Sequence, residues 1–369
     1  MIRSILALCS RDKGHDEVYQ NLLEYLEIFE SRKLSWEELV NEAELQGIAP
    51  LVFKHLKASG YKLPLKAKRL LHSLTLRHKH SNAIGNEITA DLLCSLRSGG
   101  IDCLLLKGIY LSNSIYGEIG DRPMRDIDIL VEETHAEVVR ELLLDSGFEN
   151  IAHPEIDDHH HHLNPLIKSI EGVTMSIEVH RHLLPKQLQE QRWAYSSLSN
   201  RAVKFKLGGE EAFTLNLEDT LHYLYLHGFK LPLTYEPFRL IHVADLVSLV
   251  EHRYKEIEWT HLKTVFPEVF EILSRLHFLT PYHPDVINCL PLNLSNIPSH
   301  PGLAYSGWPL RLLKDVTAPE LFSFILETIW PPQWWVQMHY GQIRGLPYLK
   351  TRFFEHPRTL WRWVKTFRI

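Results

Sequence analysis

The sequence predicts a mixed α/β (α+β) fold, in which a small mixed sheet is flanked by N- and C-terminal helical regions. Apolar residues recur at helical spacing through the first hundred residues, and short apolar or alternating runs typical of strands follow between residues 101 and 207. Helical spacing returns from Leu217 onward. We therefore expect a helical region at 1–98, an α/β core at 99–210, and a helical region at 211–369 that ends in a Trp/Pro-rich and basic tail.

Composition narrows the class of protein. The chain has 369 residues, of which 45% are hydrophobic and 23% charged, as in an ordinary folded protein of two or three domains or of one core with helical additions. A formal net charge of −5 gives no global reason to expect nucleic-acid or membrane binding. No run of about 18 apolar residues is present, so no membrane-spanning helix is predicted. The four cysteines form no CxxC pair, which favours a reducing cytoplasm over a disulfide framework.

The N-terminal region carries clear helix boundaries. Ser35 and Glu38 form a capping-box pattern, after which apolar residues keep helical spacing through Leu56. A second, long helix is predicted from about 65 to 97. Its end is predicted at Ser98-Gly99-Gly100, where a glycine can adopt the left-handed conformation.

The middle of the chain alternates strands and helices. Short apolar runs, period-2 alternation and glycine turns predict strands at 101–106, 126–131, about 160–168, 173–180 and 202–207, with helices at 109–116 and 134–146.

The strand predicted at 126–131 carries two acids, Asp126 and Asp128, separated by an isoleucine. Residues i and i+2 of a strand project from the same side, about 6–7 Å apart. Carboxylates that close repel one another unless a cation lies between them, and Mg²⁺ is the hard, oxygen-liganded ion that suits such a pair. The alternative interpretation is an edge strand with a polar face.

Two neighbouring segments favour a phosphate and metal site. Upstream, an apolar strand leads into Lys107-Gly108 at the start of a helix, where backbone N–H groups can approach a phosphate. Downstream, the strand predicted at 173–180 places Glu178 and His180 on one face. If this strand lies beside the first, Glu178 is a third oxygen ligand or the base that deprotonates an attacking hydroxyl.

These segments resemble the polymerase-β-like nucleotidyltransferase superfamily, with its glycine turn after a strand, its acid-x-acid strand and its third acid on a later strand. The runs 105–111, 122–131 and 177–180 are more narrowly similar to an uncharacterised bacterial branch, whose members often lie near natural-product or modified-peptide biosynthesis genes. The resemblance covers about residues 35 to 265. It includes the Ala-Pro-Leu element near residue 50, Asp219, His222, His227, Asp245 and Trp259, with weaker similarity at Trp334, Trp335 and His356-Pro357.

The resemblance implies a role for each matching residue. Asp126, Asp128 and Glu178 would hold Mg²⁺ or Mn²⁺, and Gly108 would lie beneath the triphosphate of an NTP, with ATP the expected one. The acceptor would be a hydroxyl, carboxyl or phosphate group on a small molecule or peptide.

Two features depart from the superfamily pattern. The usual Gly-Ser turn is replaced by Lys107-Gly108, so that a lysine charge stands in for the serine hydroxyl, and the gap from Gly108 to Asp126 is long. These departures leave a second interpretation open, a catalytically inactive protein that kept the fold and binds a nucleotide or a peptide. A P-loop kinase is not expected, because the chain has no Gly-x-x-x-x-Gly-Lys-Ser/Thr motif.

Three further residues have two interpretations each. Arg122 and Arg125 either clamp a phosphate or leaving group beside the metal, or are loop charges paired with Glu118 or Asp121. His180 either orients Glu178 or touches substrate, or is a half-buried histidine with satisfied hydrogen bonds.

The run Asp157-Asp158-His159-His160-His161-His162 is not expected to bind zinc. Consecutive residues of a strand alternate between its faces, so at most two of these histidines could point toward one centre. We expect instead a strand near the active site with one histidine facing substrate.

The C-terminal tail mixes charge and aromatic residues. Residues 341–369 carry seven Lys or Arg against a single acid, Glu355, and the last ten interleave tryptophans with cations. This pattern indicates either a surface for an anionic partner or a terminal helix whose aromatic stripe packs on the body, and we prefer the second.

Overall fold

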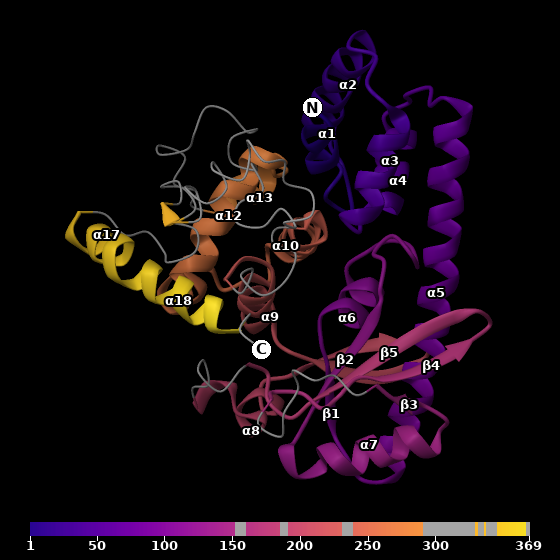
Figure 1. Cartoon of the computed structure of the whole chain (residues 1–369), viewed down its shortest axis with the longest axis vertical. Coiled ribbons are helices and arrows are strands. Elements are labelled where there is room, and N and C mark those ends of the chain that lie inside the picture. The colour runs from indigo at the N-terminus through magenta and orange to yellow at the C-terminus, as the bar shows by residue number, and fades with distance from the viewer. Residues whose placement is uncertain are drawn as a thin grey trace. The chain divides into compact units, whose positions relative to one another are not determined.

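The computed structural model confirms the α+β class, with a mixed five-stranded sheet and helices before, within and after it (Figure 1). It describes residues 1–151, 160–184, 191–230, 239–290, 329–330, 336 and 345–366. The chain divides into two units. We call Ile48–Lys54 with Lys62–Thr220 the sheet unit, and Met1–Gly47, His55–Tyr61 and Leu221–Ile369 the helical unit. The domain boundaries predicted at 98 and 210 remain a prediction.

The sheet has the strand order β1-β2-β5-β4-β3. Its strands are β1 (Cys103–Leu105), β2 (Asp126–Val131), β3 (Glu149–Asn150), β4 (Leu166–Ile170) and β5 (Val173–His180). β2 and β5 pair in parallel, and the other neighbours are antiparallel. A separate hairpin joins β6 (Val203–Leu207) to β7 (Glu210–Thr214).

The two strands that carry acids match their predicted ranges, 126–131 and 173–180. The strand predicted near 160–168 begins only at Leu166, and His162 before it forms an isolated bridge with His180.

The helices follow the predicted order. Those up to the end of the sheet region are α1 (Ile2–Leu8), α2 (Asp16–Ser31), α3 (Trp36–Leu45), α4 (Ala49–Ala58), α5 (Leu65–Ser98), α6 (Lys107–Ser114), α7 (Ala136–Asp145) and α8 (Tyr195–Ser199). Later come α9 (Leu217–Tyr225), α10 (Leu240–Arg253), α11 (Trp259–Val265), α12 (Pro267–Leu279), α13 (Pro284–Cys289), α17 (Leu346–Lys350) and α18 (His356–Thr366).

The helix-boundary signals are confirmed, with one adjustment. Ser35 caps α3 by accepting a hydrogen bond from the Glu38 backbone N–H at 3.3 Å, and Gly100 takes the left-handed conformation (φ +68°) after α5. The apolar run through Leu56 forms two helices, α3 and α4, rather than one. Gly47 breaks the run with a φ of +73°, which is favourable only for glycine.

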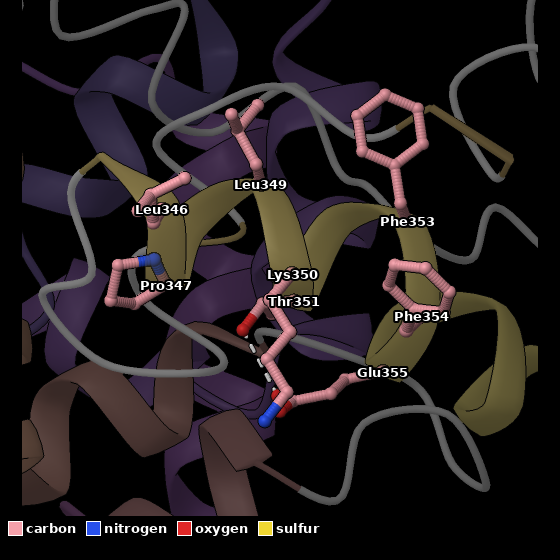
Figure 2. Close-up of a pocket in the computed structure, with 8 residues that line it drawn as sticks. All are labelled: Leu346, Pro347, Leu349, Lys350, Thr351, Phe353, Phe354 and Glu355. Carbon is pink, nitrogen blue, oxygen red and sulfur yellow. Dashed lines mark hydrogen bonds between the residues drawn. The ribbon is translucent and has the colours of Figure 1, made fainter.

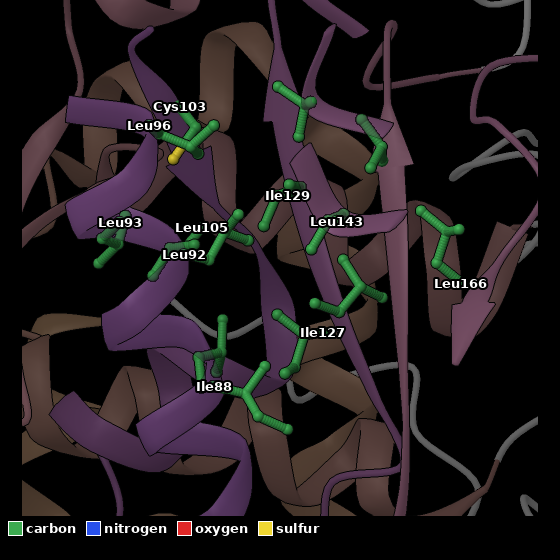
Figure 3. Packing of buried hydrophobic residues seen from close by; sticks show 14 of the residues in the cluster. Ile88, Leu92, Leu93, Leu96, Cys103, Leu105, Ile127, Ile129, Leu143 and Leu166 are labelled. Atoms are coloured by element: carbon green, nitrogen blue, oxygen red, sulfur yellow. The ribbon is translucent and has the colours of Figure 1, made fainter. Parts of the chain in front are cut away.

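One face of the sheet is buried beneath α5 and α7. Alternate residues of β1, β2 and β5 point toward this face, and they pack with Leu166 of β4 and with α5 in a single apolar cluster (Figure 3). Its labelled members include Ile88, Leu92 and Leu96 of α5, Leu105, Ile127 and Ile129 of the strands, and Leu143 of α7. Each such side chain stabilises the fold by about 1.5–3 kcal/mol on burial. The polar residues of β2 and β5 therefore project from the opposite face.

Gly85 lies where α5 packs closely on the segments of Met124 and Met175. A Cβ atom at this position would lie 3.0 Å from Met175 Cε and 3.5 Å from Met124 Cε. Since ordinary carbon contacts are about 3.5–4.0 Å, any larger residue there has to displace one of these thioether groups.

The helical unit encloses a fully buried arginine. Arg11 donates from Nε to Thr280 Oγ1 and from Nη2 to the Thr280 carbonyl oxygen, both at 3.0 Å. Its Nη1 atom lies 3.3 Å from Glu251 Oε1, close enough for an ion pair but not aligned for a hydrogen bond. Burial lowers the pKa of Arg11 and raises that of Glu251, and each charge partly offsets the shift of the other.

None of the helices described is both long and apolar enough to cross a bilayer.

Candidate active site

The parallel pairing of β2 with β5 brings the predicted acids side by side. In the strand register, Asp126 lies opposite Ser176, Asp128 opposite Glu178, and Leu130 opposite His180. Directly paired residues project from the same face of a sheet, so Asp128 and Glu178 meet on the face away from α5. The expected placement of the two strands beside each other is therefore present, although Asp128 and Glu178 lie 50 positions apart along the chain.

Asp128, Glu178 and His180 form a compact cluster. Each offers one ligand atom, and these atoms lie within 4.8 Å of one another. His180 Nε2 lies 2.8 Å from Asp128 Oδ1 and 3.7 Å from Glu178 Oε2. Asp128 and His180 are buried, whereas the side chain of Glu178 retains 24% exposure.

Burial alone would disfavour charge on these groups, but their mutual contacts outweigh it. Burial lowers the pKa of His180, and the hydrogen bond to Asp128 with the nearby carboxylate of Glu178 raises it further than burial lowers it. Burial raises the pKa of Glu178, and the neighbouring imidazole of His180 brings the net shift below the ordinary value. The cluster therefore favours a charged imidazole between two carboxylates.

Lys107 brings a second cation to Asp128. Its Nζ atom lies 3.2 Å from Asp128 Oδ1, and its side chain is only 13% exposed. The residue begins α6 with a φ of +43°, in the left-handed region that costs a non-glycine residue about 1–2 kcal/mol. In this turn the strained conformation thus falls on Lys107 rather than on Gly108.

Asp126 lies at the rim of the same face. Its side chain is exposed, so it is only partly desolvated. Desolvation by the surrounding atoms is nevertheless the first cause that raises the pKa of Asp126 to about 6, and the charge of Asp128 is the second, while Lys107 opposes the shift. The repulsion that the sequence predicted between the two acids is present, and the chain offsets part of it with Lys107.

Gly108 provides space for Arg122. A Cβ atom at Gly108 would lie 2.5 Å from Arg122 Nη1, so any side chain there would displace the guanidinium group. Arg122 is half-buried, donates from Nη1 to the Pro123 carbonyl oxygen at 3.2 Å, and lowers the pKa of Asp126 by its charge. Arg125 is exposed, and Asp121 pairs with Lys54 at 2.7 Å.

Asn82 positions the loop that leads into β2, and the sequence analysis missed it. This fully buried residue of α5 donates to the Arg122 carbonyl oxygen at 2.8 Å and accepts from the Met124 backbone N–H at 3.2 Å. Four residues later, Asn86 exchanges side-chain hydrogen bonds of 2.9 and 3.0 Å with Asn113 of α6. The available signal was two asparagines, which are poor helix formers, one turn apart inside a long helix.

One part of the expectation for the histidine run was wrong, namely that at most two of its rings could point toward one centre. His160, His161 and His162 each bring a ligand atom within 4.8 Å of the others, although at most two were expected to converge. The alternation rule does not apply, because residues 160 and 161 form a bend and residue 162 a single bridge rather than a strand. Burial lowers the pKa of His161 to about 2 and that of His162 to about 4, which favours neutral rings. Asp157, Asp158 and His159 lie outside the described residues.

Other residues of the wider resemblance have structural partners. In the sheet unit, Asp219 accepts a hydrogen bond from Arg201 Nε. His222 lies 3.0 Å from Glu268 Oε1 and stacks on Phe266 in the helical unit. Trp334 and Trp335 lie outside the described residues.

A surface hollow along α17 and the following turn is lined mainly by apolar side chains (Figure 2). They are Leu346, Pro347, Leu349, Phe353 and Phe354, together with Lys350, Thr351 and Glu355. Thr351 donates to Glu355 Oε2 at 3.0 Å. This hollow lacks the paired acids that triphosphate chemistry requires, so it is not the candidate active site. Nearby in the tail, Arg352 stacks on Trp330, and Trp361 is 61% exposed.

The donor set of the carboxylate cluster fits a hard divalent cation. Asp126, Asp128 and Glu178 offer carboxylate oxygens on one face of the sheet, and oxygen is the donor that Mg²⁺ and Mn²⁺ prefer. Loss of water raises the pKa of Asp126 first and the charge of Asp128 adds to the shift, so a bound cation would relieve a repulsion between these two acids. These residues therefore fit the ion that the resemblance implies.

Comparisons with known proteins identify a family for this chain. Residues 32–267, more than half of the chain, match the model of a family described as uncharacterised nucleotidyltransferase. Among solved structures, the chain is similar to an antigenic nucleotidyltransferase-like protein from Paracoccidioides brasiliensis, with 16% identity, a TM-score of 0.40, and coverage of 56% of this chain and 92% of that one. It is also similar to the antibiotic-resistance factor ANT(2'')-Ia, with 10% identity, a TM-score of 0.35, and coverage of 53% and 98%. The search of curated proteins found no match. By the extent of the family match, this chain belongs to the uncharacterised nucleotidyltransferase family.

Proposed function

We propose that the protein transfers a nucleoside monophosphate from an NTP, with ATP as the first candidate, to an acceptor group, and releases pyrophosphate. Asp126, Asp128 and Glu178 would hold Mg²⁺ or Mn²⁺. The observation that carries the proposal is the register of two parallel strands, which pairs Asp128 with Glu178 on the polar face of the sheet. Family membership supports the reaction class.

Each residue of the cluster has a proposed task. His180 holds the carboxylate of Asp128 in place through its 2.8 Å contact. Lys107 and Arg122 offset charge on the phosphates, and Gly108 leaves room for Arg122 to do so. Glu178, the more exposed acid, either adds a third oxygen ligand or accepts the proton of the acceptor hydroxyl. When bound, divalent cations in such a site neutralise phosphate charge and stabilise the attacking and leaving oxygens.

The acceptor belongs to the proposal as a class only: a hydroxyl, carboxyl or phosphate group on a small molecule or peptide, as in natural-product or modified-peptide biosynthesis. The four cysteines, none of which forms a disulfide, support a cytoplasmic location for this chemistry.

The test compares Asp128→Asn with Asp145→Asn, which changes an exposed aspartate at the end of α7. We expect Asp128→Asn to weaken Mg²⁺-dependent ATP binding, measured by calorimetry, by more than about 100-fold, since losing an outer partner of a metal ligand already costs about 10–100-fold. Asp145→Asn should bind as the wild type does. Unchanged ATP affinity in Asp128→Asn would remove the basis for the metal site.

Turnover separates the enzyme from an inactive relative. Pyrophosphate release is measured across pools of hydroxyl, carboxyl and phosphate acceptors, and mass spectrometry of the product distinguishes an added nucleotide from an added phosphate. Tight Mg²⁺–ATP binding without pyrophosphate release in any pool would favour a nucleotide-binding protein that kept the fold.

A further inference from the structure

Backbone hydrogen bonds hold residues 160–163 against the end of β5. Leu163 N–H donates to the Val179 carbonyl oxygen at 2.9 Å, and the N–H groups of Arg181 and His182 both donate to the His161 carbonyl oxygen at 3.0 Å. The side chain of Arg181 adds a bond from Nε to the His160 carbonyl oxygen at 3.1 Å. The positions of the three histidines are therefore set by the sheet rather than by their own chain segment alone.

The three imidazole rings pack against one another. Ring centroids lie 4.3 Å apart for His160 with His161 and for His160 with His162, and 4.7 Å apart for His161 with His162. One ligand nitrogen from each ring lies within 4.8 Å of the others. His162 is buried, and the other two are half-buried, so His160 and His161 retain some contact with solvent.

His162 has a defined tautomer. Its Nδ1 atom lies 2.8 Å from the Leu163 carbonyl oxygen, which can only accept, so Nδ1 carries the hydrogen and Nε2 carries the lone pair in the neutral ring. A metal-binding histidine is usually oriented in this way, by a hydrogen bond from its other nitrogen to a carbonyl group. The Nε2 atom faces Glu178 Oε2 at 3.9 Å. Two lone-pair atoms that face each other repel unless a cation lies between them.

We propose that His160, His161 and His162 bind one divalent transition-metal ion of the zinc class, with Glu178 as an oxygen donor within reach. Imidazole nitrogen suits Zn²⁺, Co²⁺ and Ni²⁺, whereas Mg²⁺ prefers the oxygens of the neighbouring carboxylate cluster. Three protein nitrogens with a further position open to water or a carboxylate match the ligand number of an accessible zinc site. The two sites would differ in the kind of ion they take. This inference stands on the histidine geometry and does not depend on nucleotide transfer.

The test titrates the full chain, free of any affinity tag and treated with a chelator, with Zn²⁺ and Co²⁺ in the absence of nucleotide. Calorimetry should give one zinc ion per chain, and Co²⁺ should develop the visible absorption of a nitrogen-liganded, four-coordinate ion. In a His160→Gln/His161→Gln double variant the zinc affinity should fall by more than about 10-fold. Loss of a residue that only orients a metal ligand already lowers metal affinity by at least about 10-fold, and loss of the ligand itself should cost more.

Two variants serve as controls. His80→Gln changes a half-exposed histidine of α5 that pairs with Glu171, and it should retain the wild-type affinity for zinc. Asp128→Asn should also retain zinc binding even if it loses Mg²⁺–ATP binding, which separates this inference from the proposed transfer reaction. Zinc affinity that is the same in the double variant and the wild type would overturn the proposal. So would zinc binding that is lost only in Asp128→Asn, because the ion would then lie among the carboxylates.

Discussion

Arg11 in the helical unit and Lys107 in the sheet unit are both cations next to a buried or nearly buried carboxylate, yet their surroundings differ. Arg11 is fully enclosed, and Thr280 accepts two of its hydrogen bonds while Glu251 balances its charge. Lys107 is partly exposed, has a strained backbone, and shares Asp128 with His180.

The difference separates an ion pair that is balanced within the fold from a cation that lies among several acids. Around Arg11 one cation meets one carboxylate, and Nε and Nη2 both donate to Thr280, so its charge is balanced within the fold. Around Lys107 several carboxylates share one face, and the pKa of Asp126 stays raised despite the lysine. A cluster with excess like charge and a strained residue is typical of a site that awaits a ligand.

The largest expected effect comes from breaking the structural pair. Arg11→Met should lower the free energy of unfolding by about 3–5 kcal/mol, because Glu251 is left as a buried charge without its counter-ion. Urea unfolding followed by tryptophan fluorescence measures the change. The double variant Arg11→Met/Glu251→Gln should recover part of the loss. A loss below about 1 kcal/mol would mean that Arg11 and Glu251 are not a buried pair in solution.

A smaller loss of unfolding free energy is expected at Asn82, whose neutral amide group holds the loop before β2. Asn82→Ala removes two hydrogen bonds to the loop before β2 and should lower the unfolding free energy by about 1–3 kcal/mol, since a buried N–H and a C=O lose their partner. It should also weaken Mg²⁺–ATP binding in calorimetry.

The matched control is Asn86→Ala, which breaks the side-chain pair with Asn113 four residues along the same helix. It should destabilise the fold by a similar amount while leaving Mg²⁺–ATP binding nearly unchanged. Equal loss of binding in both variants would indicate that Asn82 acts through stability alone.

The smallest expected effect on the unfolding free energy comes from replacing the two lysines that have a positive φ, Lys107 and Lys33. Lys33 also has a positive φ, +53°, but its side chain is exposed at the end of α2. Lys33→Gly should raise the unfolding free energy by up to about 1 kcal/mol, because glycine adopts this conformation without the penalty of about 1–2 kcal/mol. Lys107→Gly should gain less, since Asp128 then loses the nearby ammonium group. Equal gains at both positions, measured by urea unfolding, would show that the Lys107–Asp128 contact contributes no stability.

Much of the candidate site could be predicted from local pattern. The alternation of acids and isoleucines placed Asp126 and Asp128 on one strand face, and the same alternation placed Glu178 and His180 together. The distance between those two pairs was not local information. It depends on a parallel pairing across a connection that includes α7, β3 and β4, which only the folded sheet defines.

Two features could not be predicted by the rules applied. Asn82 contacts a loop about forty positions later, and nothing in its own helix indicates that partner. The histidine run was interpreted with strand alternation, but hydrogen bonds to Val179, Arg181 and His182 impose a bend instead. In both cases a long-range backbone contact decides the geometry, and local spacing does not report it.

Gly85 lies behind the strands that carry the acids. Met124 lies two positions before Asp126. Met175 lies one position before Ser176, which pairs with Asp126. Both thioethers next to Gly85 therefore belong to the segments that carry the acidic face. The absence of a methyl group at this position of α5 leaves room for the two thioethers. A side chain there would press on the apolar side of the same strands whose opposite side carries the carboxylates.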